Sequence, residues 1–231
     1  MNIVELVTLF RAEADDEVET YLWSDDAIVG FYNDAESEAC RRMKLIFDKT
    51  TADVCEIAVD DSTATYLIHS AITRIMKAYL VDTAGELIYL GILSRDELDR
   101  ISPNWREDTG DPRYLVIDET SVEIVPAPTV DYTLKLEVYR TPLEEMFYPL
   151  DPVPDPAPDP LIVSPEIAPA HHRYLLHWAL HRAYSRRDVA KADPGEAEKH
   201  ERKFGRYFGF RSTADRGRKA RTDRPHTNKV W

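Results

Sequence analysis

The sequence predicts an α+β protein: a helical bundle with an inserted antiparallel β domain and an extended C-terminal arm. Apolar residues recur at helical spacing near both ends of the chain, whereas short runs in the middle alternate apolar with polar residues, as strands do. After Phe210 the chain loses all apolar periodicity. The expected parts are N-terminal bundle helices at 1–51, a β insertion domain at 52–142, a linker at 143–164, C-terminal bundle helices at 165–209 and the arm at 210–231.

The N-terminal part should hold two helices. A short apolar helix is expected over about 3–11, followed by an acidic stretch at 13–19. Ser24 then has the features of an N-cap, because Asp25 and Asp26 follow in the first turn and Trp23 is placed to pack against Ile28. A continuous apolar stripe predicts a helix of about six turns, and its members are Ile28, Phe31, Tyr32, Ala35, Ala39, Met43, Ile46 and Phe47.

From residue 52 the apolar period changes from 3.6 to 2, with Cys55, Ile57 and Val59 on one face of a first strand. A turn is expected at Asp60-Asp61-Ser62, and a short helix should open with the capping box that Ser94 and Glu97 can form. Many short strands joined by turns indicate a compact antiparallel sheet or small sandwich. The further strands are expected at 63–68, 72–81, 87–91, 113–118, 121–125 and 132–140.

Residues 149–160 hold six prolines and three aspartates, a composition that favours an extended, exposed linker. Helical sequence resumes beyond it. Pro169 should lie near a helix start, because proline inside a helix costs roughly 3 kcal/mol. The helix around Trp178 is apolar on most sides and should therefore pack between several neighbours. A last helix should open at Asp193-Pro194 and end near Gly209.

Charge divides the chain unequally. Residues 199–231 hold eleven Lys or Arg and three Asp or Glu, a net of +8, whereas the whole chain carries −13, so residues 1–198 carry −21. An acidic body repels nucleic acid, so any contact with nucleic acid would have to come from the basic arm. The arm has no aromatic residue between 211 and 229 and ends in Val230-Trp231, which favours protein docking over a nucleic-acid tail. The remaining alternative is a solvated terminus without a partner.

The cysteines, the apolar runs and the N-terminus indicate the compartment in which the protein is made. Cys40 and Cys55 belong to no motif and are typical of a reducing environment. No apolar run approaches the ~20 residues that a bilayer-spanning helix needs. The N-terminus has no basic region ahead of an apolar one, so we expect no signal peptide and synthesis in a cytosol.

His177 and His181 are the strongest candidates for chemistry, because two histidines at i, i+4 can bind zinc. No Glu follows His177 as in a zinc-protease motif, and Arg173, a fixed cation, lies one turn earlier. The alternative is a polar line on a helix edge that faces a partner, formed by Arg173, His177, His181 and Ser185. Phosphate-binding loops and nucleophile motifs are missing, so we expect no enzyme, no cofactor and no metal.

Several segments, in order along the chain, resemble head-to-tail adaptor (connector) proteins of tailed bacteriophages. The resemblance covers nearly all of residues 20–210, and it depends on the order and spacing of pieces that are individually short. The segments that carry it are Leu-Trp-Ser-Asp-Asp-Ala-Ile at 22–28, Tyr-Asn-Asp-Ala at 32–35, Leu-Ser-Arg-Asp-Glu-Leu-Asp at 93–99, Gly-Asp-Pro-Arg-Tyr at 110–114, Tyr-Arg-Thr-Pro-Leu at 139–143, Pro-Glu-Ile at 165–167 and Phe-Gly-Arg-Tyr-Phe-Gly at 204–209.

The resemblance implies a structural protein of the virion neck, made in the host cytoplasm. Such subunits would form a ring of about twelve beneath the portal protein, extend the DNA channel without specific DNA binding, and give tail proteins a platform. In this family the C-terminal segment reaches the portal. That role carries over to Phe208, Phe210, Arg211, Arg216, Arg218, Lys219, Arg221, Arg224, Lys229, Val230 and Trp231. The polar line of Arg173, His177, His181 and Ser185 would then lie at the interface between subunits.

Three alternatives remain at the level of sequence. The chain could be another ring protein of the neck, such as a tail-completion subunit. It could be a nucleic-acid-binding protein that uses the basic arm, or a zinc hydrolase built on His177 and His181.

Overall fold

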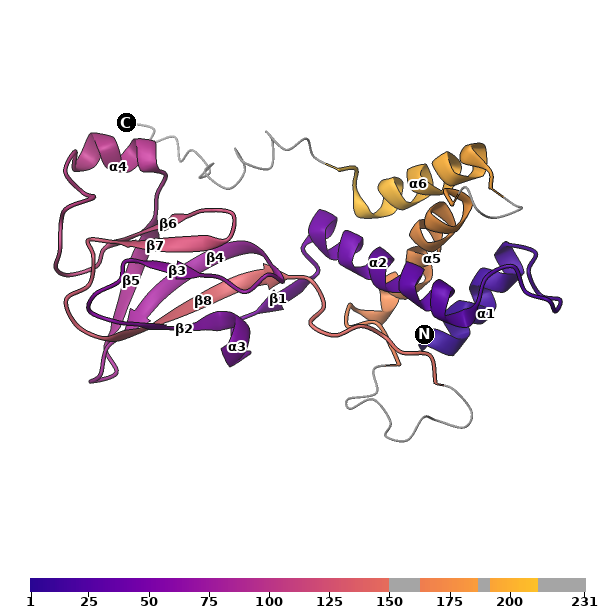
Figure 1. Cartoon of the computed structure of the whole chain (residues 1–231), viewed down its shortest axis with the longest axis horizontal. Helices are drawn as coiled ribbons and strands as arrows, with labels where there is room; N and C mark the ends of the chain where they lie inside the picture. The colour runs from indigo at the N-terminus through magenta and orange to yellow at the C-terminus, as the bar shows by residue number, and fades with distance from the viewer. Residues whose placement is uncertain (150–162, 187–191, 212–231) are drawn as a thin grey trace, which may run out of the picture. The chain divides into compact units, whose positions relative to one another are not determined.

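The computed structural model describes residues 1–149, 163–186 and 192–211, and the chain divides into two compact units. We call residues 1–46 with 141–211 the helical unit, and residues 47–140 the β unit. Figure 1 labels the elements. In chain order they are α1 (Ile3–Glu13), α2 (Asp25–Met43), β1 (Ile46–Asp48), α3 (Ala52–Cys55), β2 (Glu56–Val59), β3 (Thr65–Leu67), β4 (Ile72–Val81), β5 (Leu87–Ile92), α4 (Arg95–Ile101), β6 (Tyr114–Ile117), β7 (Ser121–Val125), β8 (Tyr132–Arg140), α5 (Pro169–Tyr184) and α6 (Pro194–Phe208).

The helical unit is built around α5, which packs against α1, α2 and α6 (Figure 1). This explains why α5 is apolar on most of its faces, as the sequence predicted. Its core includes Phe10, Tyr32 and Phe204, all fully buried. The Tyr32 hydroxyl donates to the carbonyl of Leu6 at 2.8 Å, which joins α2 to α1 and satisfies a buried polar group.

The predicted helix starts are confirmed. The hydroxyl of Ser24 accepts from the N–H of Ala27, Pro169 occupies the first turn of α5, and the Asp193 carboxylate accepts from the first N–H groups of α6. The predicted end of α2 is wrong. Lys44 has a φ of 55°, in the left-handed region, and this residue ends the helix at Met43. Ile46 and Phe47, which continue the helical stripe in the sequence, belong instead to β1.

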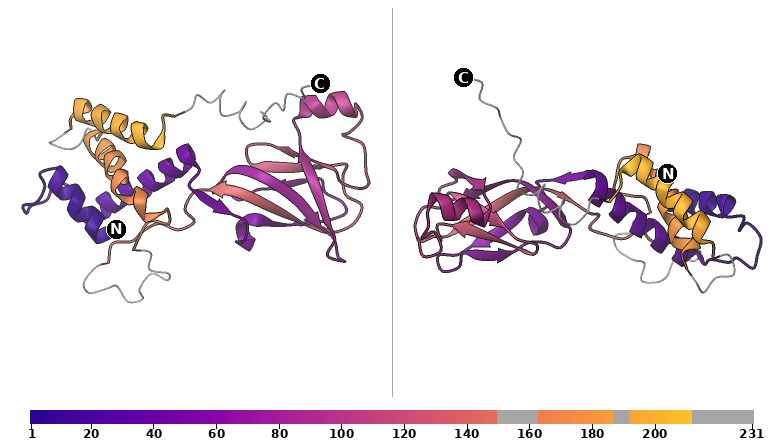
Figure 2. Two further views of the ribbon diagram at one scale, coloured as in Figure 1. Left: turned by 180° about the vertical axis from the view of Figure 1, so that it is seen from behind. Right: turned by 90° about the horizontal axis from the view of Figure 1, so that it is seen from above.

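The β unit is a curled sheet with strand order β1-β8-β4-β5-β6-β7-β3, in which β2 also pairs with β8. Both views in Figure 2 show the strands of this unit curving around a common interior. The predicted strands at 72–81, 121–125 and 132–140 are confirmed. Two expectations need correction. The pair β5–β6 is parallel, so the sheet is mixed, and Cys55 ends the short helix α3 rather than lying in a strand.

A buried ion pair fixes the two ends of the β unit's chain to each other. Nε of Arg140, at the end of β8, lies 2.6 Å from a carboxylate oxygen of Asp48 in β1. Asp48 also accepts from the backbone N–H groups of Thr50 and Thr51, which holds the turn before α3. The entry and the exit of the β unit are thus joined by one carboxylate.

Two expectations lie largely outside the described residues: the extended form of the linker at 149–160, of which only residue 149 is described, and the arm beyond Arg211. Among the described helices, none is long and apolar enough to cross a membrane.

Candidate functional site

The root of the basic arm, at the end of α6, is a polar site that joins α6 to α2 within the helical unit. Gly209 ends α6 with a φ of 85°, a conformation that favours glycine, and turns the chain back over the helix. The ring of Phe210 then lies against Gly205, so closely that a Cβ on Gly205 would meet the ring at 2.6 Å. The close approach of Phe210 therefore requires glycine one turn before the helix end.

Glu38 on α2 receives the first residue beyond this turn. Its carboxylate oxygen Oε1 accepts from Nε of Arg211 at 2.6 Å and from Nε of Arg42 at 2.8 Å. Nη1 of Arg42 donates to the carbonyl of Gly209 at 2.9 Å. We call this set of Glu38, Arg42, Gly209 and Arg211, together with the Phe210 ring on Gly205, the arm latch. Burial alone raises the pKa of Glu38, but the hydrogen bonds from Arg211 and Arg42 outweigh it, so the pKa is lowered.

Aromatic rings complete the arm latch. The guanidinium of Arg42 lies 4.9 Å from the ring centroid of Trp178 and 5.0 Å from that of Phe204, and the guanidinium of Arg211 lies 5.4 Å from Trp178. These distances fall within the range of cation–π attraction. The side chains of Glu38 and Arg42 are 6% and 4% exposed, whereas that of Arg211 is 65% exposed. One ion pair of the arm latch is therefore buried and the other is open to solvent.

The residues to which the resemblance gives a docking role fall into three groups. Phe208 is fully buried in the core of the helical unit, so contact of its ring with a partner would require the end of α6 to open. Phe210 is 70% exposed, and Arg211 is held by Glu38. The others lie outside the described residues: Arg216, Arg218, Lys219, Arg221, Arg224, Lys229, Val230 and Trp231.

The polar line on α5 meets α6 of the same chain. Nδ1 of His177 lies 3.3 Å from Nδ1 of His200, and Nδ1–H of His181 donates to the carbonyl of Ala197 at 2.9 Å. Arg173 is exposed, and the hydroxyl of Ser185 donates to the carbonyl of His181. The two histidines thus join α5 to α6, while the ends of the line are open to solvent. The sequence could have suggested His200, since it shares the buried face of α6 with Ala197 and Phe204.

The histidine pair makes the α5–α6 contact sensitive to acid. Burial, followed by the positive charge of Lys203, lowers the pKa of both imidazoles, that of His200 to about 4. Glu196, whose carboxylate lies 3.8 Å from Nε2 of His200, acts in the opposite direction. The folded state therefore holds neutral imidazoles at a pH where the unfolded chain takes up protons.

We expect the free energy of unfolding to fall by about 2 kcal/mol through His200 as the pH drops from 6.5 to 4, because the unfolded chain binds the proton first. The figure is below the full shift because exposed lysines contribute part of it and are screened by salt. Urea unfolding followed by circular dichroism at 222 nm, at several pH values, measures it. His200→Gln should lose this contribution, so that its stability changes with pH differently from that of the natural protein, whereas the exposed His69→Gln should keep the natural pH dependence; equal slopes in all three proteins would contradict the assignment.

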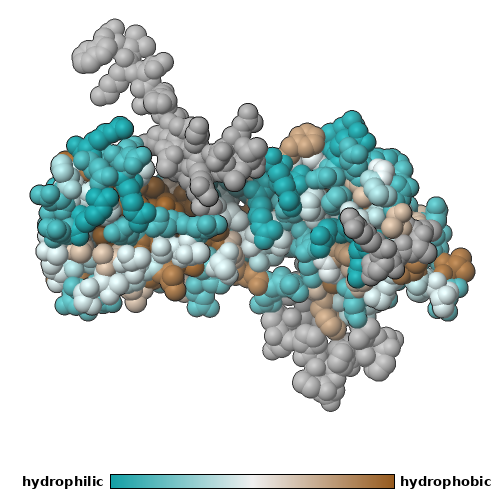
Figure 3. All heavy atoms as spheres, turned by 45° about the horizontal axis from the view of Figure 1, so that its top comes forward, coloured by the Kyte–Doolittle hydropathy of each residue, from teal (hydrophilic) through white to brown (hydrophobic). Residues whose placement is uncertain are grey.

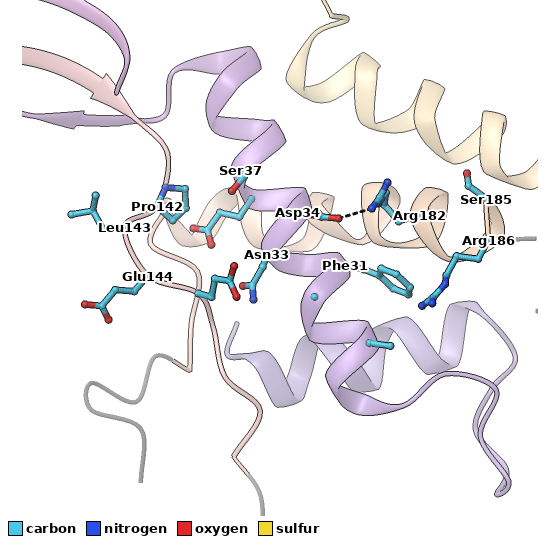
Figure 4. Close-up of a pocket in the computed structure, with 14 residues that line it drawn as sticks. Phe31, Asn33, Asp34, Ser37, Pro142, Leu143, Glu144, Arg182, Ser185 and Arg186 are labelled. Atoms are coloured by element: carbon cyan, nitrogen blue, oxygen red, sulfur yellow. Dashed lines mark ion pairs between the residues drawn. The ribbon is translucent and has the colours of Figure 1, made fainter. Parts of the chain in front are cut away.

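A polar cavity of about 710 Å³ lies elsewhere in the helical unit, between α2, the segment at 142–145 and the end of α5. Figure 4 shows Asp34 of α2 paired with Arg182 of α5, at 3.0 Å, and Phe31 directed toward Arg186. The Arg186 guanidinium is 5.8 Å from the Phe31 ring centroid. The cavity holds side chains of both charges and suits a polypeptide contact better than a compact ion.

The β unit has a groove of about 560 Å³, lined by both apolar and charged residues, where its sheet divides. β5 pairs with β4 only over Leu87–Leu90 and then pairs with β6 from Gly91, so the first half of β4 and the end of β6 diverge. Ile75, Leu90 and Val116 are among the lining residues. Figure 3 shows apolar atoms exposed between hydrophilic ridges on this unit. Such an opening can accept side chains of an extended polypeptide.

Nothing in the described residues gathers three or more His, Cys, Asp or Glu side chains in a way that could hold a metal ion. Neither His177 nor His181 is directed at a shared third ligand; each contacts α6 separately.

A search of curated proteins gives no match. The family model described as "SU10 adaptor protein" matches residues 1–228, which is essentially the whole chain. That match confirms the resemblance carried by segments such as 22–28 and 93–99. The chain belongs to the SU10 adaptor family, the head-to-tail adaptor proteins of bacteriophages.

Proposed function

We propose that the protein is the subunit of a head-to-tail adaptor ring, about twelve copies of which dock beneath the portal protein, extend the DNA channel and carry the tail proteins. It would act as a structural component of the virion neck, without catalysis or cofactor. The observation that carries the proposal is the basic segment that begins at the arm latch: Arg211 is pinned to α2, and six further Lys or Arg follow it against two Asp. Such a segment suits an acidic partner surface.

Charge supports the role of the body in the same assembly. Residues 1–198 carry −21, so a ring of such bodies would present a strongly acidic wall. Like charge keeps DNA from adhering to that wall during its passage. The DNA would thus pass through the channel without specific binding.

For the contact between neighbouring subunits we propose the exposed ends of the polar line on α5. Arg173 is exposed and Tyr174 beside it is 38% exposed, while Ser185 lies at the other end of the helix. His177 and His181 would serve this contact indirectly, since their bonds to α6 hold the helix pair in place. A closed ring requires two different faces on each subunit, and the polar cavity beside Asp34 is a candidate for the second.

Removal of residues 212–231 tests the proposal. The truncated protein should keep the unfolding midpoint of the full chain, because Phe210 still packs on α6 and Arg211 still contacts α2. Its association with purified portal ring should weaken by more than tenfold, measured by surface plasmon resonance. A matched control keeps all 231 residues and replaces only the two acids of the segment, Asp215 and Asp223, by asparagine, which should bind at least as well as the natural chain.

Unchanged portal binding by the truncated protein would remove the docking role of the arm. Binding to random duplex DNA, measured in parallel, tests the alternative that the arm binds nucleic acid. If the arm served nucleic acid, duplex affinity would fall steeply with salt and would vanish on truncation.

A further inference from the structure

We propose that the arm latch opens during docking. When an acidic partner surface binds Arg211, Arg211 dissociates from Glu38 and the neighbouring Phe210 ring leaves Gly205. The inference rests on the proposed function, because that function supplies the acidic partner. It adds a conformational step to docking and assigns the step to Glu38, Arg42 and Gly205, three residues of the body that lie outside the arm itself.

Glu38 has two counter-ions of different kinds. Arg42 comes from the same helix, at i, i+4, and is 4% exposed, so it stays beside Glu38 whatever the arm does. Arg211 is 65% exposed and comes from a segment 173 positions away in sequence. Loss of Arg211 therefore does not leave a buried carboxylate without a partner, which is the situation that makes the breaking of a buried ion pair costly. Arg211 is the exchangeable member.

The closed state also holds an unsatisfied group. Nη2 of Arg42 is buried and has no hydrogen-bond partner among the described residues. Nη1 of the same guanidinium donates to the carbonyl of Gly209, so the turn at Gly209 lies over this side chain. A buried donor without an acceptor opposes closure. When the turn lifts, water or a partner's carboxylate can reach Nη2, which offsets the loss of the Arg211 contact.

The third contact, between Phe210 and Gly205, is weak by its geometry. The Phe210 ring touches the helix along one side and remains 70% exposed. The rotation that turns the ring away buries no polar group, and the glycine beneath it is left intact within α6. The arm latch is thus closed by one solvent-exposed ion pair, one backbone contact, one partly exposed ring and the cation–π contact of Arg211 with Trp178.

The variant Gly205→Ala opens the arm latch without changing any charge. Its Cβ would lie 2.6 Å from the Phe210 ring, so the ring must move, whereas α6 gains a better helix former. The matched control is Gly30→Ala, also within a helix, where a Cβ meets nothing within 4 Å. In the full-length protein, the backbone order parameters at 209–211, measured by 15N relaxation, should fall below about 0.6 in Gly205→Ala, the range of a flexible segment, and stay at the natural value in Gly30→Ala.

Association with the portal ring then tests release. If docking requires an open arm latch, Gly205→Ala should associate about threefold faster than the natural protein, and Gly30→Ala at the natural rate. Arg211→Ala should also lower the order parameters at 209–211 but dissociate about threefold faster, because the group that the partner takes is gone; Arg206→Ala, which replaces an exposed arginine on α6, should do neither.

The outcomes separate the two proposals. If Gly205→Ala lowers the order parameters at 209–211 but associates at the natural rate or more slowly, the release step is wrong while docking by the arm stands. If the order parameters at 209–211 are the same in all variants, the contacts of Phe210 and Arg211 do not hold the arm and the inference is overturned. If the natural protein does not bind the portal ring at all, the proposed function fails, and the release step fails with it.

Discussion

Replacement of Arg140 by alanine is expected to destabilise the β unit by about 3–5 kcal/mol, the usual cost of removing one partner from a buried ion pair. The side chains of Arg140 and Asp48 are 8% and 4% exposed, and their contact is 2.6 Å. Without the guanidinium, Asp48 remains buried beside uncharged donors, among them the N–H groups of Thr50 and Thr51, the Thr51 hydroxyl and the Cys55 thiol. Burial raises the pKa of Asp48, but the Arg140 hydrogen bond and these N–H groups hold it well below its usual range.

An exposed ion pair in the same sheet provides the control. Nζ of Lys135 in β8 lies 2.8 Å from Glu56 in β2, and these side chains are 36% and 38% exposed. Lys135→Ala should therefore cost less than 1 kcal/mol. Urea unfolding of the three full-length proteins measures both changes. Equal costs for Arg140→Ala and Lys135→Ala would show that the Asp48 pair does not hold the ends of the unit as described.

Local signals in the sequence predicted much of the fold. β8 was predicted with its observed ends, because Leu134, Leu136 and Val138 alternate with polar residues along one face. The caps at Ser24, Ser94 and Asp193 were predicted because a side-chain acceptor precedes N–H groups that no helix residue can satisfy. These features depend on neighbours within a few positions, which a single sequence contains.

Features that depend on distant residues could not be predicted. The helical stripe of α2 continues into Ile46 and Phe47, and only the left-handed backbone at Lys44 ends it. The parallel pair β5–β6 depends on where the chain returns after α4. In the candidate site, Glu38 and Arg42 look like an ordinary i, i+4 surface pair. Their burial and the arrival of Arg211 come from the packing of α6 and α5 on α2.

Glu36→Gln is expected to stabilise the helical unit by about 3 kcal/mol above pH 7, although it removes a native carboxylate. Glu36 is 2% exposed, accepts from the N–H of Ile167 at 3.0 Å and has no ion-pair partner among the described residues. Burial raises its pKa to about 7, despite the lowering effect of backbone hydrogen bonds from Ile167 and Glu166. Glutamine keeps an acceptor for Ile167 and carries no charge that must be buried.

The direction in which stability changes with pH follows from the proton that Glu36 holds in the folded state. Between about pH 4.5 and 7 the folded state holds a proton on Glu36 that the unfolded chain has released, so the stabilising effect of that proton is complete below 4.5 and is lost as the pH rises through 7. Glu36→Gln and the natural protein should thus be about equally stable at pH 4 and diverge at higher pH, which urea unfolding at each pH measures. The control is Glu144→Gln, which replaces an exposed glutamate of the segment at 142–145. Its stability should stay equal to that of the natural protein at every pH.

The same comparison tests both buried titrating sites of the helical unit. His200 makes stability rise with pH between about 4 and 6.5, and Glu36 makes it fall over nearly the same range, so the two slopes largely cancel in the natural protein. In Glu36→Gln, stability should therefore rise with pH because of His200. In His200→Gln, stability should fall with pH because of Glu36. A Glu36→Gln protein whose stability stays flat from pH 4 to 7 would contradict the assignment of His200, and a His200→Gln protein that stays flat would contradict that of Glu36.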